Sequence, residues 1–294
     1  MSLPHGPWTA TRLLTLCTAA FGLGGPPAFA DETAPMAQPP VSGPGTGPGA
    51  WPVLGALGGA VRIAPEHPGA VRTSTGVTPN FVLRWGRVTV SNGGPLASRF
   101  GEPVEAGLGA DLLDVDHLRI SASLSVDQGR RSGDVARLVG VHDIPSHLRG
   151  RLRVGWRLHS RWEAMAVWRT DLSGRGTGNS ADLTLLHDWR PEFIDHRRWR
   201  ISLGATVEVL DARRANLIHG ITEEDAQRSR LPAYRLGAGT SEWRLFTNGQ
   251  RELGDGWVAY GSMGFSRLVG EAAGSPIVLR PHGVSASVGL GRRF

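Results

Sequence analysis

Arginines recur at alternate positions between Leu148 and Leu158, in the stretch LRGRLRVGWRL. Arg149, Arg151 and Arg153 share one parity. Guanidinium groups bind carboxylates and phosphates through charge-assisted, often paired, hydrogen bonds. The chemistry that these residues could perform is therefore the recognition of anions.

Histidines and acids give weaker chemical signals. The spacing of His142 and His147 would permit a metal site, but solvated histidines in a loop are the simpler interpretation. Asp195 and His196 are adjacent, with no serine nucleophile placed beside them. The motifs GxSxG and HExxH do not occur. The sequence therefore predicts no catalytic residue, no metal site and no cofactor.

The arginines alternate with apolar residues, which indicates a β-strand, because successive strand side chains point to opposite faces. Leu152, Val154 and Trp156 would share the apolar face. The same alternation returns in residues 118–127, 199–209 and 284–291. Segments of roughly ten residues with this pattern are typical of transmembrane β-barrels. We therefore expect an all-β, membrane-spanning, antiparallel up-and-down barrel with lipid outside and a polar lumen inside.

About twelve strands are expected, and ten is the alternative if the second and third are misassigned. Connections after even-numbered strands are mostly short and those after odd-numbered strands longer, as in barrels with short periplasmic turns and long external loops. The expected strands are residues 52–63, 71–78, 81–90, 104–113, 117–126, 148–158, 162–170, 181–189, 199–210, 233–243 (or slightly beyond), 257–267 and 284–294.

Composition agrees with a barrel. The hydrophobic content is 40% and the mean hydropathy is −0.16, with no apolar run long enough for a transmembrane helix. The chain has ten tryptophans, several near expected strand ends, where indole rings favour the membrane boundary. The core of a soluble sandwich is the alternative. The terminal Phe294 is typical of a last barrel strand read by the assembly machinery, although Arg292 interrupts the apolar parity.

The N-terminal region predicts export. Arg12 precedes an apolar stretch, residues 13–23, and Ala28-Phe29-Ala30 has the form of a cleavage site, so residues 1–30 are expected to be a signal peptide. A membrane anchor is the alternative, but the apolar stretch is short for it. Residues 31–50, rich in Pro and Gly, are expected to be a flexible periplasmic arm, and residues 51–294 the barrel. The only cysteine, Cys17, would be removed.

The charge pattern argues against nucleic-acid binding. The net charge is +6 and all 32 basic residues are arginine, spread over strands and loops rather than gathered in one patch. Arginine suits a polar lumen, acidic partners across the barrel, or the phosphates of outer-membrane lipid and lipopolysaccharide.

Two late stretches resemble a known family. Residues 219–234, HGITEEDAQRSRLPAY, are similar to a segment before a late strand of the MipA/OmpV family, with His219 and Arg230 in place of an aromatic residue and a glycine. Residues 266–278, SRLVGEAAGSPIV, are similar to the family's segment before the last strand. The region around Trp85-Gly86-Arg87 and Asp143-Ile144-Pro145 is also similar. The resemblance covers most of residues 51–294.

The resemblance implies an outer-membrane barrel of a Gram-negative cell, of the MltA-interacting type. It implies a scaffold that links murein-hydrolase and murein-synthase enzymes, as the family's namesake does, while other members are linked to adhesion or stress responses. Two alternatives remain: a narrow anion-preferring pore or ligand-binding barrel that uses Arg149, Arg151 and Arg153, and a glycolipid-modifying enzyme. In the late stretch, the acids 223–225 could pair with Arg228 and Arg230, or Thr222 and Asp225 could cap a short helix. We favour the cap.

Overall fold

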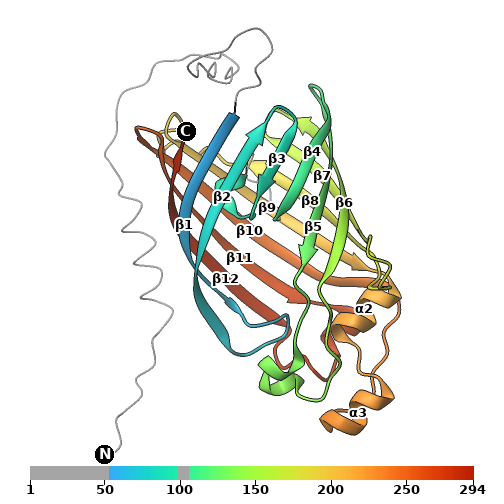
Figure 1. Cartoon of the computed structure of the whole chain (residues 1–294). Helices are drawn as coiled ribbons and strands as arrows, with labels where there is room; N and C mark the ends of the chain where they lie inside the picture. Colours follow the sequence, from blue (N-terminus) through green and yellow to red (C-terminus); the bar gives the residue numbers. More distant parts are fainter. Residues whose placement is uncertain (1–52, 99–105) are drawn as a thin grey trace, which may run out of the picture. The chain divides into compact units, whose positions relative to one another are not determined.

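The computed structural model describes residues 53–98 and 106–294, so the expected signal peptide and arm lie outside the described residues. The described residues form twelve antiparallel strands that close into a barrel in chain order, with β1 paired to β12 (Figure 1). The strands are β1 (Val53–Pro65), β2 (Thr73–Trp85), β3 (Val88–Ser91), β4 (Gly107–Asp114), β5 (Leu118–Asp127), β6 (His147–His159), β7 (Trp162–Asp171), β8 (Ser180–Asp188), β9 (Trp199–Leu210), β10 (Gly239–Gly254), β11 (Trp257–Leu268) and β12 (His282–Arg293).

Short helices lie between strands. They are the 3₁₀ turns η1 (Pro95–Ala97), η2 (Ser132–Asp134) and η3 (Ala136–Leu138), and the α-helices α2 (Ala212–His219), α3 (Glu223–Ser229) and α4 (Gly270–Ala273). Across residues 53–98 and 106–294, we find no helix with the length and apolar character to span a membrane.

The predicted parity is confirmed on β6. Leu152 is 44% exposed and Trp156 53% exposed, on the outer face, while Arg151 donates to Ser123 on the inner face. Similar apolar side chains cover the outside of the other long strands. An apolar band of this extent around a closed barrel is typical of a surface that faces lipid. Strand alternation therefore places hydrocarbon outside and polar groups inside, as expected for a transmembrane barrel.

The two ends of the barrel differ. We call one the turn end, where the connections are residues 86–87, 115–117, 160–161, 189–198 and 255–256. The other is the cap end, where the helices α2 and α3 lie (Figure 1). Its connections follow β1, β3, β5, β7, β9 and β11, and their described residues are 66–72, 92–98, 106, 128–146, 172–179, 211–238 and 269–281. The predicted alternation of short and long connections is confirmed.

The expected turn at Pro79-Asn80 is wrong, because β2 runs unbroken through both residues and turns at Gly86-Arg87. The backbone N–H of Phe81 points towards β3 and donates to the side chain of Asn92, just after β3. The nitrogen of Pro79, two residues earlier, therefore points to the same side, beyond the end of the short β3. Proline is tolerated in a strand at such an edge, because no ladder bond requires its missing N–H.

The tenth strand is also misplaced by sequence. It begins at Gly239 and continues to Gly254, beyond the expected residues 233–243. Its second half carries Asn248 and Gln250 inward, and both side chains are buried in the barrel. The outward-facing positions there are Thr247 and Gly249, which are not strongly apolar. The alternation of apolar and polar residues is therefore lost, and the sequence pattern does not predict a strand.

Tryptophans mark one membrane boundary. Six lie at or beside the turn end of their strands, and all but Trp199 are at least 39% exposed. Their exposure contradicts the alternative of a soluble core, and the amphipathic indole ring suits the interface between lipid and water. The six are Trp85, Trp156, Trp162, Trp189, Trp199 and Trp257.

The barrel closes through the last residue. The backbone N–H groups of Gly55 and Phe294 each donate to the carbonyl of the other, both at 2.9 Å. The ring of Phe294 lies over Gly55, where an added Cβ would come within 2.4 Å of the ring. A larger residue at position 55 would push this ring aside, and Phe294 itself stays 63% exposed.

Part of the connection after β3 folds into the barrel. Leu96 of η1 packs against Ala56, Ala60 and Tyr260 on the inner wall. The side-chain amide of Gln250 donates to the Pro95 carbonyl, at 2.5 Å, and to the Ser98 carbonyl, at 3.2 Å. The segment thus fills one side of the lumen and leaves an open space against the opposite wall.

Candidate anion site in the lumen

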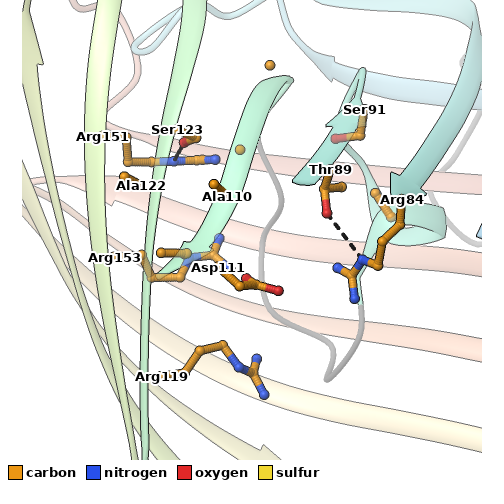
Figure 2. Close-up of a pocket in the computed structure, with 14 residues that line it drawn as sticks. Arg84, Thr89, Ser91, Ala110, Asp111, Arg119, Ala122, Ser123, Arg151 and Arg153 are labelled. Atoms are coloured by element: carbon orange, nitrogen blue, oxygen red, sulfur yellow. Dashed lines mark hydrogen bonds between the residues drawn. The ribbon is translucent and has the colours of Figure 1, made fainter. Parts of the chain in front are cut away.

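The remaining space is an open cavity on the inner face of β2 to β6. It holds about 620 Å³ of empty space, part of it open solvent. Four arginines and one carboxylate line it, together with serine and threonine hydroxyls and small residues (Figure 2). The charged lining residues are Arg84, Asp111, Arg119, Arg151 and Arg153.

One row across five strands builds the floor of this cavity. Strand register places Arg84 beside Thr89, Thr89 beside Gly109, Gly109 beside Ser123, and Ser123 beside Arg151. The Arg84 Nε donates to Thr89 Oγ1 at 3.1 Å, and the Arg151 Nε donates to Ser123 Oγ at 2.7 Å. Gly109 in the middle carries no side chain and keeps the space open. Hydroxyl groups thus hold a guanidinium at each end of the row.

A second row lies nearer the turn end. Register places Asp111 beside Ser121 and Ser121 beside Arg153, and Arg119 lies one step further along β5. Arg119 Nε is also 3.6 Å from Asp114. In Figure 2, Arg153 and Asp111 lie close together, and Arg84 and Arg119 extend into the same space. The lining residues alone, four arginines and one aspartate, sum to a formal charge of +3, and Asp114 beside Arg119 offsets part of it.

Only two of the three arginines predicted for the lumen site reach this cavity. Arg151 and Arg153 line it, whereas Arg149 lies towards the cap end, where it donates to Ser180 at 2.9 Å and is 3.7 Å from Asp127. Sequence reasoning missed Arg84 and Arg119 as partners. The alternation in β5 placed Arg119 on the polar face, but only the strand register could bring it beside Arg84.

Most other charges inside the barrel compensate one another. Buried Asp182 on β8 accepts from Arg169 at 2.9 Å and from Arg244 at 3.1 Å. Removal of one partner from a buried charge network is costly, so such pairs fix neighbouring strands to each other.

The cap-end connections form a small structure with its own apolar core. Leu138 after β5, Ile221 after β9 and Ile277 after β11 are buried together. A second cluster joins Leu210 and Ala215 to residues beside β10 and in α4. Gly140 adopts a positive φ of 88°, and an added Cβ would meet the backbone of Arg228 at 2.8 Å. We call this structure the cap.

Asp225 is the polar centre of the cap. The predicted capping box is confirmed, because Thr222 and Asp225 exchange hydrogen bonds between side chain and backbone at the start of α3. Arg228 donates to Asp225 at 2.9 Å, and His142 lies 2.7 Å from it. Burial alone would raise the pKa of Asp225, but the hydrogen bonds from His142, Thr222 and Arg228 outweigh it and lower the pKa to about 2.

The interpretation of His142 and His147 as solvated is wrong. His142 is held between Asp225 and the carbonyl of Leu217, and His147 is 3% exposed beside Asp127 and Arg214. Loop closure over the barrel end buries His147 and partly buries His142, which their local sequence does not reveal. Within residues 53–98 and 106–294, no three His, Asp or Glu side chains are grouped to hold a metal ion.

The Ser275-Pro276 motif also belongs to the cap. Ser275 is buried and its hydroxyl donates to the carbonyl of His219 at 2.5 Å, which ties the last long connection to α2. Burial lowers the pKa of His219 to about 4, and nearby Arg130 and His67 act in the same direction. The two motifs that carry the family resemblance therefore contact each other.

Similar solved structures include the COG4313 outer membrane channel from Pseudomonas putida F1 (9% identity, 90% of this chain, 100% of that chain, TM-score 0.41). They also include the CymD monoaromatic hydrocarbon channel (9% identity, 83% of this chain, 89% of that chain, TM-score 0.40). A third is OmpT of Vibrio cholerae (6% identity, 83% of this chain, 97% of that chain, TM-score 0.35). No curated protein matches the sequence. A family model described as "MltA-interacting protein MipA" matches residues 57–294, and the chain therefore belongs to this family, as an outer-membrane β-barrel protein.

Proposed function

We propose that this outer-membrane barrel is a scaffold that holds a murein hydrolase, and with it a murein synthase, at the periplasmic face. The family description, an interaction with MltA, supports such a partner. In outer-membrane barrels, short turns face the periplasm. The docking surface would therefore lie at the turn end.

One feature of the turn end carries the proposal. The connection 189–198 is the longest at this end, and its Phe193 is 68% exposed. Trp189 packs edge-on against Phe193, with ring centroids 6.3 Å apart. The Asp195 carbonyl accepts from Arg198 and Trp199 and holds the loop in shape. A large exposed aromatic residue on an ordered loop is the kind of group that anchors protein interfaces.

The test is binding of the purified full barrel, in detergent, to a purified MltA-type lytic transglycosylase. Phe193→Ala should weaken binding roughly 30-fold, because truncation of an interface anchor costs on the order of 2 kcal/mol. Leu279→Ala is the matched control, since Leu279 is similarly exposed (55%) but belongs to the cap end. Equal binding by both variants, or no binding by the wild type, would remove the basis of the scaffold proposal.

A second function, an anion-preferring pore, is favoured by the arginine-lined cavity. Planar-bilayer recordings should then give a conductance that prefers chloride to potassium, and Arg151→Gln should reduce this preference. A barrel that carries no current in such a bilayer is not a pore.

A further inference from the structure

We infer that the outer face of β10, β11 and β12 binds a phosphorylated lipid at the cap end, with Arg267 and Arg280 holding its phosphate groups. The three strands are neighbours in the barrel wall (Figure 1). Longer connections of outer-membrane barrels are external, so lipid beside the cap end belongs to the outer leaflet. This face includes neither the lumen nor the turn end, and the inference therefore holds or fails independently of the scaffold and the pore.

Arg267 lies at the membrane boundary of the cap end. On β11 it follows ten residues after Trp257, which lies at the boundary of the turn end. A tilted transmembrane strand crosses the hydrocarbon layer in about 9–11 residues. The outward positions between the two residues include Met263 (42% exposed) and Phe265 (37% exposed). The outward-facing residues of β11 thus change from apolar to cationic at the depth of the lipid headgroups.

An aromatic surface surrounds Arg267. Strand register places Trp243 of β10 on one side of it and His282 of β12 on the other. Phe265, the next outward residue towards the turn end, has its ring centroid 5.4 Å from that of Trp243 and 6.4 Å from that of His282. Aromatic rings at such a boundary combine an apolar body with a polar edge. The rings therefore offer a surface to the upper part of an acyl chain, with a guanidinium group beside them for the headgroup.

Arg280 places a second guanidinium group beside the same rings. Its Nε donates to His282 Nε2 at 3.0 Å, and its backbone N–H donates to the carbonyl of Gly69 at 3.1 Å. The same carbonyl accepts from the backbone of Leu279 at 3.0 Å, so the connection between β1 and β2 holds this segment in place. The bond to His282 uses one of the five N–H donors of an arginine side chain, and the donors on the two terminal nitrogens suit an anion.

The charge of this face favours an anionic headgroup. No carboxylate of the described residues forms an ion pair with Arg267 or Arg280, and both side chains are exposed. Acids in the adjoining connections have other partners: Glu66 lies 3.7 Å from Arg72, and Glu271 accepts from a backbone N–H at 2.6 Å. Guanidinium groups bind phosphate through paired hydrogen bonds, and basic groups at a bilayer surface attract anionic lipid. A phosphorylated headgroup would supply the negative charge that these two arginines lack.

The experiment is native mass spectrometry of the full barrel in detergent, titrated with bis-phosphorylated lipid A and with the same lipid after removal of both phosphates. Lipid A should bind, and the dephosphorylated lipid should bind much more weakly. Arg267→Gln/Arg280→Gln should weaken lipid A binding roughly 25-fold, because each basic residue at an anionic lipid surface contributes about fivefold. The matched control is Arg251→Gln/Arg292→Gln, which makes the same change of charge on outward-facing arginines of β10 and β12 at the turn end.

Heat-dependent mobility on gels verifies that each variant is folded. The site is supported if only the cap-end double variant loses lipid A while the control retains it. It is overturned if the two double variants bind lipid A alike, if the dephosphorylated lipid binds as well as lipid A, or if the folded wild type binds neither lipid.

Discussion

Asn80 on β2 donates a hydrogen bond of 2.9 Å to the hydroxyl of Tyr260 on β11, across the interior of the barrel. Both side chains are buried, at 7% and 1% exposure, and the strands are not neighbours in the sheet. The contact therefore braces two walls on the side of the lumen that η1 fills. Tyr260 belongs to the same apolar cluster as Leu96.

Tyr260→Phe should destabilise the barrel by about 1–3 kcal/mol, because the buried amide of Asn80 loses its partner. Denaturant unfolding in detergent, followed by tryptophan fluorescence, measures this change. The double variant Asn80→Val/Tyr260→Phe should cost less than the two single changes together. A Tyr260→Phe barrel within ~0.5 kcal/mol of the wild type would mean that the contact does not contribute.

Asp182→Asn should destabilise the barrel by roughly 3–5 kcal/mol, because it leaves Arg169 and Arg244 facing a neutral group in the interior. Both arginines reach the same carboxylate oxygen of Asp182. The same unfolding experiment applies. Asp195→Asn, which changes an exposed acid at the turn end, is the control and should cost at most about 1 kcal/mol. Equal effects of the two changes would contradict the role given to Asp182.

Parity allowed much of this architecture to be predicted. Alternation of leucine, valine and tryptophan with arginine and serine identified the long strands and the face each residue takes, since the fold must satisfy lipid and water on opposite sides. Pro79 led to a wrong prediction of a turn, because proline normally interrupts a strand. It is acceptable in β2 because β3 ends before it reaches Pro79, so no backbone N–H is needed there. The cavity could not be predicted, because β3 is short and the meeting of Arg84 with Arg119 depends on register.

The cap should loosen as the pH falls below about 6.5. His219 is buried and its pKa falls to about 4, against 6.5 when exposed. An opened cap therefore binds a proton between these values and the closed cap does not, so closed-cap stability is complete above 6.5 and declines on acidification. The loss is about 2 kcal/mol at pH 5. Hydrogen exchange of α2 amides at pH 7 and pH 5, corrected for intrinsic rates, measures it.

His219→Gln should remove this pH dependence, whereas His196→Gln, at the turn end, should leave it intact. Asp225 affects the stability of the cap in a lower range of pH. Its pKa of about 2 lies below the usual 3.8, so its contribution is present above 3.8 and is lost as the pH falls through 2. Loosening of the cap only below pH 4 would assign the effect to Asp225 rather than to His219.

Phe294→Ala should lower the yield of folded barrel in the outer membrane while leaving folded molecules nearly as stable. We infer this because the Phe294 ring is 63% exposed, and the closing hydrogen bonds to Gly55 come from its backbone. We therefore expect the exposed ring to contribute little to the stability of the finished barrel, and propose that it acts earlier, in recognition by the assembly machinery. Heat-modifiable protein in membrane fractions reports yield, and unfolding of the purified variant reports stability. Gly55→Ala is a useful contrast, because an added Cβ there would push the exposed ring aside while the backbone hydrogen bonds of the seam remain, so it should change stability little. A Phe294→Ala barrel with normal yield and reduced stability would instead place the role of this residue in the seam.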